Sequence, residues 1–334
     1  MKISVILTAY GRRKYIYDAL NSIFAQSLEH SKFEVVVVSN FDYAIENKPT
    51  DLQITNIVSE GTIGEFLAKG LCVARNEIVA FLDDDDLWER NRLEEVLRVF
   101  ESDERIVYYH NSVRYIDDTG NELEILFRNP KRLNNHIIKV IQLSRMEVLN
   151  LINLGVSFNL SSIAVKKSVL NIWMDDISSI KANPDGFMFW SSLITGGVVC
   201  QDNRPLTRYR VHSENKTDVL SYEKAGGEIK DQIETFEKLH EHCSNGGLYK
   251  RKGIICHFIV LQILEWNSLR LMISHSGRKA LLGDLKKMIG FWKYAGDITM
   301  MRIFIYSVAF LVTPRLFATV FRLISLRGNY RTHP

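Results

Sequence analysis

The chain has 334 residues, of which 46% are hydrophobic and 24% charged, with six prolines and four scattered cysteines. This composition excludes long disordered linkers. The cysteine spacing excludes a disulfide framework and a C-x-x-C zinc site, which favours a reducing compartment. The formal charge is +3, but residues 269–334 contain 11 Lys or Arg against two Asp or Glu, a local +9, so residues 1–268 carry −6. An acidic body with a basic, apolar tail favours contact with an anionic membrane face over nucleic acid.

The first 110 residues alternate between strand and helix patterns. Compact apolar runs at 3–8, 33–39, 78–82 and 106–110 predict buried strands, and apolar stripes at 16–24 and 93–100 predict helices between them. Met1–Leu7 runs directly into the first strand without a small-residue cleavage site, so we expect no signal peptide. Strand–helix–strand order predicts an α/β fold with a parallel, doubly wound sheet.

Beyond residue 120 the pattern changes twice. Residues 120–215 indicate a mixed second half of the same domain, which ends in an extended segment at 204–211. From about 222 onward the pattern is helical almost throughout. We therefore expect one domain at 1–215 and a helical C-terminal region at 216–334 that becomes basic and apolar toward its end.

Four consecutive aspartates, Asp83 to Asp86, follow the predicted strand at 78–82. Ligands in doubly wound sheets bind beyond the carboxyl ends of the strands, so Thr8–Gly11 and Ser39-Asn40 should meet Asp83 at one edge. Four adjacent carboxylates repel one another unless a cation neutralises them, and Mg²⁺ or Mn²⁺ prefers carboxylate oxygens completed by phosphates and water. The alternative is a solvated acidic turn at a helix N-terminus.

Four segments in this order resemble family 2 glycosyltransferases of the bacterial and archaeal type, which have the GT-A fold. They are Ser4–Tyr10, Phe33–Val38, Ile78–Trp88 and, more weakly, Pro205–His212. The resemblance implies a GT-A type Rossmann-like sheet with an appended C-terminal helical region. It also implies inverting transfer of a sugar from a nucleoside diphosphate donor, with Mg²⁺ or Mn²⁺ as cofactor.

The resemblance also suggests roles for individual residues. Asp85 and His212 become the metal ligands, and Asp185, ahead of a predicted helix at 186–195, becomes the catalytic base. The residues expected to bind the donor nucleotide are Thr8, Ala9, Tyr10, Asn40, Lys69, Asp83, Asp84 and Arg210.

Each of the less specific assignments has a simpler alternative. Asp185 suits the N-cap of its helix, and Lys69 suits an ordinary surface lysine. His212 suits a strand end without a metal, and Arg210 suits an ion pair with a surface acid. The sequence also departs from the family after the second strand, where Ser39-Asn40 replaces the usual aspartates, so a UDP donor is favoured less firmly than the diphosphate itself.

Two other functions remain open at this stage. A sugar nucleotidyltransferase shares the layout and the metal, but Thr8–Arg13 lacks its Gly-rich signature with Arg and Lys. A catalytically degenerate family member would bind nucleotide without transferring sugar.

The C-terminal tail contains two apolar runs, 303–313 and 316–326, separated by Pro314-Arg315. Together they have the length of a spanning helix, but Arg315 would lie near its centre, where a charge is costly. We therefore expect helices that lie in the membrane interface, with peripheral contact through 295–330 at the cytoplasmic face of the cell membrane. The alternative is a buried hairpin, packed on the domain or at a homodimer contact. The expected acceptor is a glycan or a lipid-linked sugar.

Overall fold

The computed structural model describes residues 1–123 except 12 and 46, then 137–140, 144–212, 222–245, 253–273 and the single residues 282, 286 and 308. These residues fall into two compact units, the first of which ends at His212. The expected domain boundary at 215 and, apart from residue 308, the tail at 295–330 lie outside the described residues, so both stay predictions.

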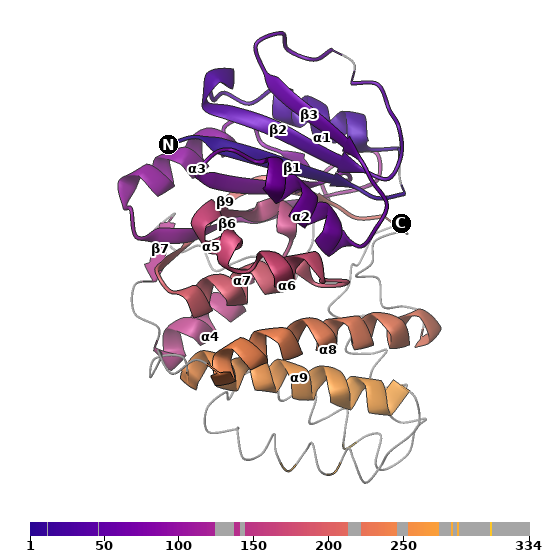
Figure 1. The fold of residues 1–334 in the computed structure, drawn as a ribbon, viewed down its shortest axis with the longest axis vertical. Helices are drawn as coiled ribbons and strands as arrows, with labels where there is room; N and C mark the ends of the chain where they lie inside the picture. Colours follow the sequence, from indigo (N-terminus) through magenta and orange to yellow (C-terminus); the bar gives the residue numbers. More distant parts are fainter. Residues whose placement is uncertain are drawn as a thin grey trace. The chain divides into compact units, whose positions relative to one another are not determined.

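The first unit is built on a mixed sheet with nine strands among the described residues (Figure 1). Their order is β3-β2-β1-β4-β8-β6-β9-β5, and β7 pairs with β9. The strands are β1 (Ile3–Ala9), β2 (Phe33–Ser39), β3 (Gln53–Val58), β4 (Ile78–Asp83), β5 (Leu87–Trp88), β6 (Ile106–Ile116), β7 (Ile137–Val140), β8 (Ile163–Lys166) and β9 (Val198–Arg210).

Helices connect the strands on both faces of this sheet. They are α1 (Ile16–Phe24), α2 (Ile63–Val73), α3 (Arg92–Ser102), α5 (Lys167–Ile172), α6 (Met174–Ser178) and α7 (Pro184–Thr195), with 3-10 turns at His30–Lys32 and Leu160–Ser162. Most of α4 (Arg145–Asn153) belongs to the second unit. The predicted α/β class is confirmed, and so are the strands and helices expected before residue 110.

The alternation of side chains along β1 and β2 explains why these strands are mostly apolar, with their few polar side chains buried. Both are fully buried and pair in parallel, Ile3 beside Phe33. Val5 and Val35 belong to the core under α1 and α3, whereas Val36 packs with Phe66 of α2 on the opposite face. A strand covered on both faces has no position for a polar side chain exposed to water.

The sheet departs from the expected parallel order after β4. Strand β8 enters between β4 and β6 and runs antiparallel to both, so β4 and β6 are parallel but not adjacent. β8 has only four residues, too few to show a clear pattern in the sequence. It brings the preceding loop, residues 155–162, to the carboxyl end of β4.

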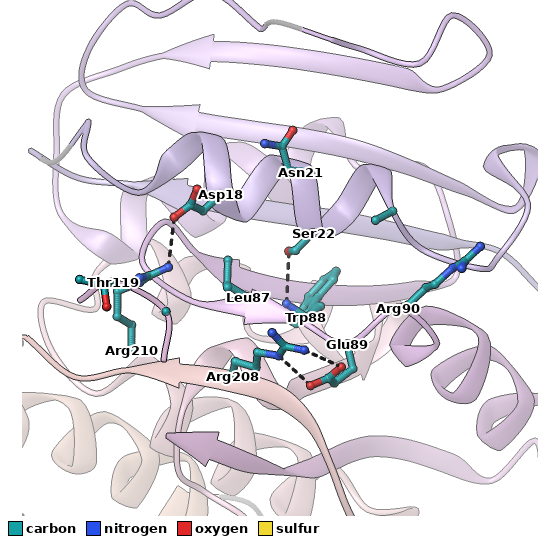
Figure 2. Close-up of a pocket in the computed structure, with 12 residues that line it drawn as sticks. Asp18, Asn21, Ser22, Leu87, Trp88, Glu89, Arg90, Thr119, Arg208 and Arg210 are labelled. Carbon is teal, nitrogen blue, oxygen red and sulfur yellow. Dashed lines mark hydrogen bonds and ion pairs between the residues drawn. The ribbon is translucent and has the colours of Figure 1, made fainter. Parts of the chain in front are cut away.

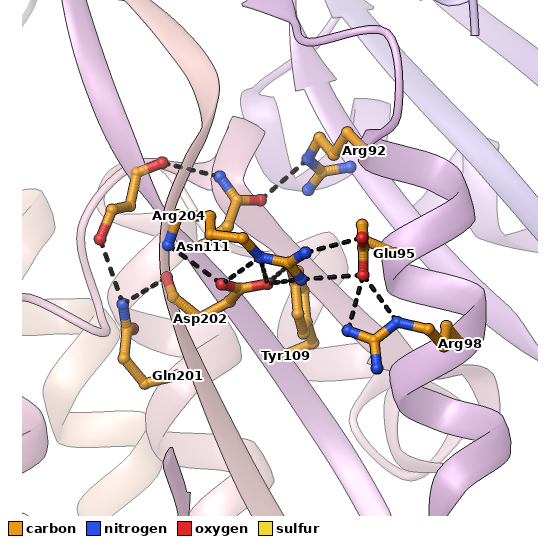
Figure 3. A network of polar contacts seen from close by, with 9 residues as sticks. Arg92, Glu95, Arg98, Tyr109, Asn111, Gln201, Asp202 and Arg204 are labelled. Carbon is orange, nitrogen blue, oxygen red and sulfur yellow. Dashed lines mark hydrogen bonds and ion pairs between the residues drawn. The ribbon is translucent and has the colours of Figure 1, made fainter. Parts of the chain in front are cut away.

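A buried polar network ties β9 to β6 and α3 (Figure 3). The Asp202 side chain is fully buried, accepts a hydrogen bond from the Tyr109 hydroxyl at 2.9 Å and pairs with Arg204 at 2.6 Å. Arg204 also pairs with Glu95 of α3 at 2.6 Å. A buried carboxylate is tolerated only when it is paired in this way. The network therefore fixes the strand whose far end carries Arg210 and His212.

The second unit contains α8 (Tyr222–Asn245) and α9 (Gly253–Ile273), which lie side by side (Figure 1). Ile229 and Ile233 of α8 pack against Ile263 and Trp266 of α9. This helical pair confirms the helical pattern expected after residue 222. Within the described ranges, none of the helices combines the length and the apolar character needed to cross a bilayer.

Candidate functional site

The carboxyl ends of β1, β2 and β4 meet at one edge of the sheet, as expected. The Thr8 hydroxyl donates to Asp83 Oδ1 at 3.0 Å, and the Asp84 amide donates to the Thr8 carbonyl at 3.1 Å. The Asn40 amide donates to the Ala9 carbonyl at 3.3 Å, and Asn40 Oδ1 accepts from the Gly11 amide at 2.8 Å. Three segments that are far apart in the sequence are thereby joined into one surface at the carboxyl ends of three parallel strands.

Tyr10 and Lys69 lie toward the β2–β3 side of this edge. Tyr10 is 48% exposed, and its ring makes an edge-on contact with Phe66, with the centroids 5.7 Å apart. The Lys69 ammonium donates to the Ser59 hydroxyl and, at 3.2 Å, to the Glu60 carbonyl, just beyond β3. Their assignment to the donor nucleotide stays a prediction.

The four consecutive aspartates have different surroundings. Asp84, Asp85 and Asp86 are only 2%, 8% and 1% exposed, so the alternative of a solvated acidic turn is wrong. Asp86 points inward, where its two oxygens accept from the Arg210 amide at 2.9 Å and from Asn159 Nδ2 at 3.0 Å. Burial, reinforced by the charges of Asp85 and Asp83, raises the pKa of Asp86 well above its ordinary value. Asp86 is therefore a structural carboxylate.

Asp85 and His212 form the pair that best suits a metal ion. His212 Nε2 lies 3.0 Å from Asp85 Oδ2, and the Asp85 carbonyl accepts from Arg210 Nε at 2.8 Å. The described residues hold no cluster of three or more His, Cys, Asp or Glu side chains that could bind a metal on their own. Mg²⁺ and Mn²⁺ need no such cluster, because one or two protein ligands with donor phosphates and water complete their shell. The chemistry of this pair fits such an ion.

Arg210 lies behind the pair and is 1% exposed. Its Nη2 pairs with Asp18 Oδ2 of α1 at 3.2 Å, and its Nη1 donates to the carbonyls of Asp117 and Asp118 at 3.3 and 3.1 Å. The expected ion pair with a surface acid is thus present, since the Asp18 side chain is 57% exposed. A direct contact of Arg210 with the donor phosphates stays a prediction.

Asp185 lies in the first turn of α7, and it is not the N-cap of that helix. α7 begins at Pro184, and Asn183 caps it by accepting from the Gly186 amide at 2.9 Å. The alternative that Asp185 is the N-cap of its helix is therefore wrong. Burial raises the pKa of the Asp185 carboxyl, while the backbone amides of Gly186 and Asn159 partly offset the rise by donating to it.

Asn159 connects the base to the acidic run, and the sequence did not point to it. Its amide donates to Asp185 Oδ2 at 3.0 Å, its Nδ2 donates to Asp86, and its Oδ1 accepts from the Ser161 amide at 2.7 Å. Its φ of 67° falls where few residues other than glycine are tolerated, and asparagine is one of them. The only sign in the sequence was that Asn159 lies in a short segment between turn-forming residues, Gly155 on one side and Ser161-Ser162 on the other.

Comparison with known proteins identifies the first part of the chain. Residues 4–153 match the family model described as Glycosyl transferase family 2. These residues belong to glycosyl transferase family 2. The match includes β1, β2, β4 and the four aspartates, whereas Asp185, Arg210 and His212 lie beyond it.

Two relatives illustrate the breadth of the family. An uncharacterized glycosyltransferase from Nostoc is 27% identical over 226 residues, 64% of this chain and 66% of the relative. An Escherichia coli glucosyltransferase, named for transfer from UDP-Glc to α-D-GlcNAc-diphosphoundecaprenol, is 23% identical over 63% of this chain and 78% of its own length. The aligned parts cover slightly less than two thirds of the Nostoc relative, and only 18% and 40% of relatives from Rickettsia bellii and Bacillus subtilis.

Solved structures share the fold at low sequence identity. The S. aureus TarS 1–349 structure in complex with UDP is 16% identical, with a TM-score of 0.53 over 97% of this chain and 87% of that one. A mannosyltransferase from Pyrobaculum calidifontis, in complex with GDP-Man and Mn²⁺, is also 16% identical, with a TM-score of 0.51 over 96% and 85%. Both structures share the fold of this chain, which confirms the expected GT-A type fold.

Proposed function

We propose that the protein is an inverting glycosyltransferase that moves a sugar from a nucleoside diphosphate donor, with UDP-sugars favoured, to a hydroxyl or phosphate of an acceptor. One observation carries the proposal. His212 contacts Asp85 at 3.0 Å, and the next residue in the chain, Asp86, accepts a hydrogen bond at 3.0 Å from Asn159. The Asn159 amide in turn donates to Asp185 at 3.0 Å, so the Asp85–His212 pair at the end of β4 is linked to Asp185. This arrangement holds a diphosphate site and a base in one rigid frame.

The donor would lie along the edge formed by β1, β2 and β4. Thr8, Asn40 and Asp83 offer hydrogen-bonding groups to the nucleoside there, and Asp85 and His212 would hold Mg²⁺ or Mn²⁺. When bound, such an ion neutralises the charge that develops on the departing diphosphate. The buried cation Arg210 fixes Asp85 from behind through its contact with the Asp85 carbonyl. The site is therefore organised before the donor arrives.

The acceptor would be activated by Asp185. A carboxylate with a raised pKa is a stronger base than an ordinary one, because it holds the abstracted proton more tightly. The Asn159 amide fixes one oxygen of Asp185, which orients the carboxylate for attack from one side of the bound sugar.

For the acceptor we propose a lipid-linked sugar or a polysaccharide at the cytoplasmic face of the membrane. Two observations support this choice. The E. coli relative is named for a diphosphoundecaprenol acceptor, and the basic, apolar tail suits peripheral contact with an anionic surface.

Thermal stability in the presence of nucleotides tests the donor site. We expect UDP or GDP to raise the melting temperature in the presence of Mn²⁺, because a ligand that binds only the folded state stabilises it. Asp85→Ala should abolish the Mn²⁺-dependent part of the rise. Asp51→Ala is a matched control, since Asp51 is an exposed carboxylate that pairs with His30 away from the carboxyl ends of the strands. If no nucleoside diphosphate shifts the melting temperature, the proposal fails.

A further inference from the structure

The first unit has a pocket to which the proposed transfer assigns no role (Figure 2). It has a volume of about 460 Å³ and lies between α1, β5, the end of β9 and the turn at 117–121. Small-molecule sites typically enclose roughly 300–1,000 Å³. The residues that matter for its chemistry are Asp18, Asn21, Trp88, Glu89, Arg208 and Arg210.

Two ion pairs contribute to the wall of this pocket. Asp18 pairs with Arg210 at 3.2 Å, and Glu89 pairs with Arg208 at 2.8 Å, with a second contact at 3.2 Å (Figure 2). Because each carboxylate faces a guanidinium, the wall carries alternating acceptors and donors, and Arg90 gives the lining a net charge of +1. A phosphate would meet the carboxylates of Asp18 and Glu89, and a cation would meet the arginines.

The neutral parts of the lining complete this picture. Asn21 is exposed on α1 and offers both an amide donor and an amide acceptor. The Ser22 hydroxyl accepts from the Trp88 amide at 3.2 Å, which anchors β5 against α1. The partly exposed side chain of Leu87 adds an apolar group to the lining. A sugar has hydroxyls that donate and accept at once and an apolar ring face, so it matches this mixture better than a purely apolar or a purely ionic ligand does.

We propose that this pocket binds a saccharide unit of the acceptor, other than the unit that receives the transferred sugar. The inference rests on the proposed function. Arg210 connects the two sites, because its guanidinium lines the pocket while its Nε and main-chain amide bond the Asp85 carbonyl and Asp86. The pocket is thus separated from the acidic run by a single side chain, close enough for one glycan to contact both.

Ligand-observed NMR on the full chain tests the proposal. Saturation transfer to D-glucose, D-galactose, D-mannose and N-acetyl-D-glucosamine would be measured without nucleotide or metal. We expect at least one of these sugars to bind the wild-type protein. Asp18→Asn removes a charged hydrogen-bond partner, and such a loss weakens binding about tenfold or more. Asn21→Phe, at an exposed position of α1, should fill the pocket and abolish the signal.

Matched variants separate this pocket from other sites. Asp118→Asn makes the same change at an exposed carboxylate that pairs with Lys14 and does not line the pocket, so sugar binding should persist. Asp85→Ala should also keep it. The proposal is overturned if no sugar binds, or if binding is lost in Asp85→Ala but kept in Asn21→Phe, which would place the sugar in the donor site.

An anion control addresses the exposed Arg90 at this pocket. Inorganic phosphate should not displace the sugar. If phosphate binds and Arg90→Gln abolishes that binding, the pocket is an anion site and the saccharide assignment is wrong. Failure of the proposed function would instead appear as a melting temperature that no nucleoside diphosphate changes, whether or not the sugars bind.

Discussion

Asp185 combines a half-buried position in the first turn of α7 with a backbone donor, the Asn159 amide, at 3.0 Å. Capping is left to Asn183, so the carboxylate is available for acceptor chemistry. Asp185→Asn keeps the shape and the acceptor for the Asn159 amide but cannot take up a proton. We expect kcat to fall by roughly 10²–10⁴, the usual contribution of a general base, while titration calorimetry shows nucleotide affinity close to that of the wild type.

The raised pKa of Asp185 gives this prediction a pH dependence. In the proposed mechanism the active form of Asp185 is the carboxylate, so kcat/KM should fall as the pH drops through the pKa of Asp185 in the folded protein. Because burial raises that pKa, the fall should begin at a higher pH than an ordinary aspartate would give. In Asp185→Asn this acid limb should vanish from the residual rate. Persistence of the limb would assign it to another group.

The backbone conformation and the hydrogen bonds of Asn159 lead to a prediction about the stability of the protein. Replacement by alanine places a β-carbon residue at φ 67° and removes the Nδ2 donor from the buried Asp86. Backbone strain of about 1–2 kcal/mol and an unsatisfied buried acceptor of about 1–3 kcal/mol should together lower the free energy of unfolding by about 3 kcal/mol.

Asn47 supplies the control for Asn159, since it has φ 53° but is exposed. Asn47→Ala should lose only the strain contribution, about 1 kcal/mol. Urea denaturation of both variants separates the two effects. Equal losses would mean that the bond to Asp86 contributes nothing measurable.

At the scale of elements, the packing of α2 on α6 depends on one glycine. A β-carbon on Gly64 would lie 2.2 Å from the Ile177 carbonyl oxygen and 2.6 Å from both Ile180 N and Ile180 O. Alanine favours a helix by about 1 kcal/mol over glycine, but a backbone contact this short forces the helices apart, at a cost of about 3 kcal/mol or more. Gly64→Ala should therefore lower the melting temperature, whereas Gly253→Ala, which meets nothing within 4 Å, should leave it unchanged or raise it.

The elements that were predicted correctly are those with a strong local pattern. β1, β2 and β4 are apolar on both faces, and α1 has a single apolar stripe, so each was evident from the residues alone. β3 was not predicted, because its side chains alternate irregularly between exposed and partly buried along QITNIV. β6 extends six residues beyond its predicted end at 110 because β9 pairs along its whole polar half.

The candidate site was likewise predicted only in part. The meeting of Thr8, Asn40 and Asp83 followed from the rule for parallel strands. The inward orientation of Asp86, the cap at Asn183 and the link through Asn159 did not follow. Each depends on contacts between segments or on a local φ value that composition and spacing do not encode, such as the bond between Asn159 and Asp86 across 73 residues.

At the scale of the whole molecule, the distribution of charge leads to the last prediction. The terminal 66 residues carry +9 while the rest carries −6, and each basic residue near an anionic bilayer contributes about 1 kcal/mol. We expect the full chain to co-sediment with phosphatidylglycerol vesicles. Raising the salt from about 0.1 M to about 1 M shortens the screening length from about 10 Å to about 3 Å and should weaken the binding.

Charge reversal within the tail tests this expectation without shortening the chain. Arg315→Glu combined with Arg322→Glu changes the local charge by four units and should release most of the protein from the vesicles. Arg98→Glu, at an exposed position of α3 in the first unit, reverses a charge outside the tail and should leave co-sedimentation intact. Should the tail variant sediment as fully as the wild type, its arginines do not contact the membrane, and the buried hairpin becomes the better description of residues 295–330.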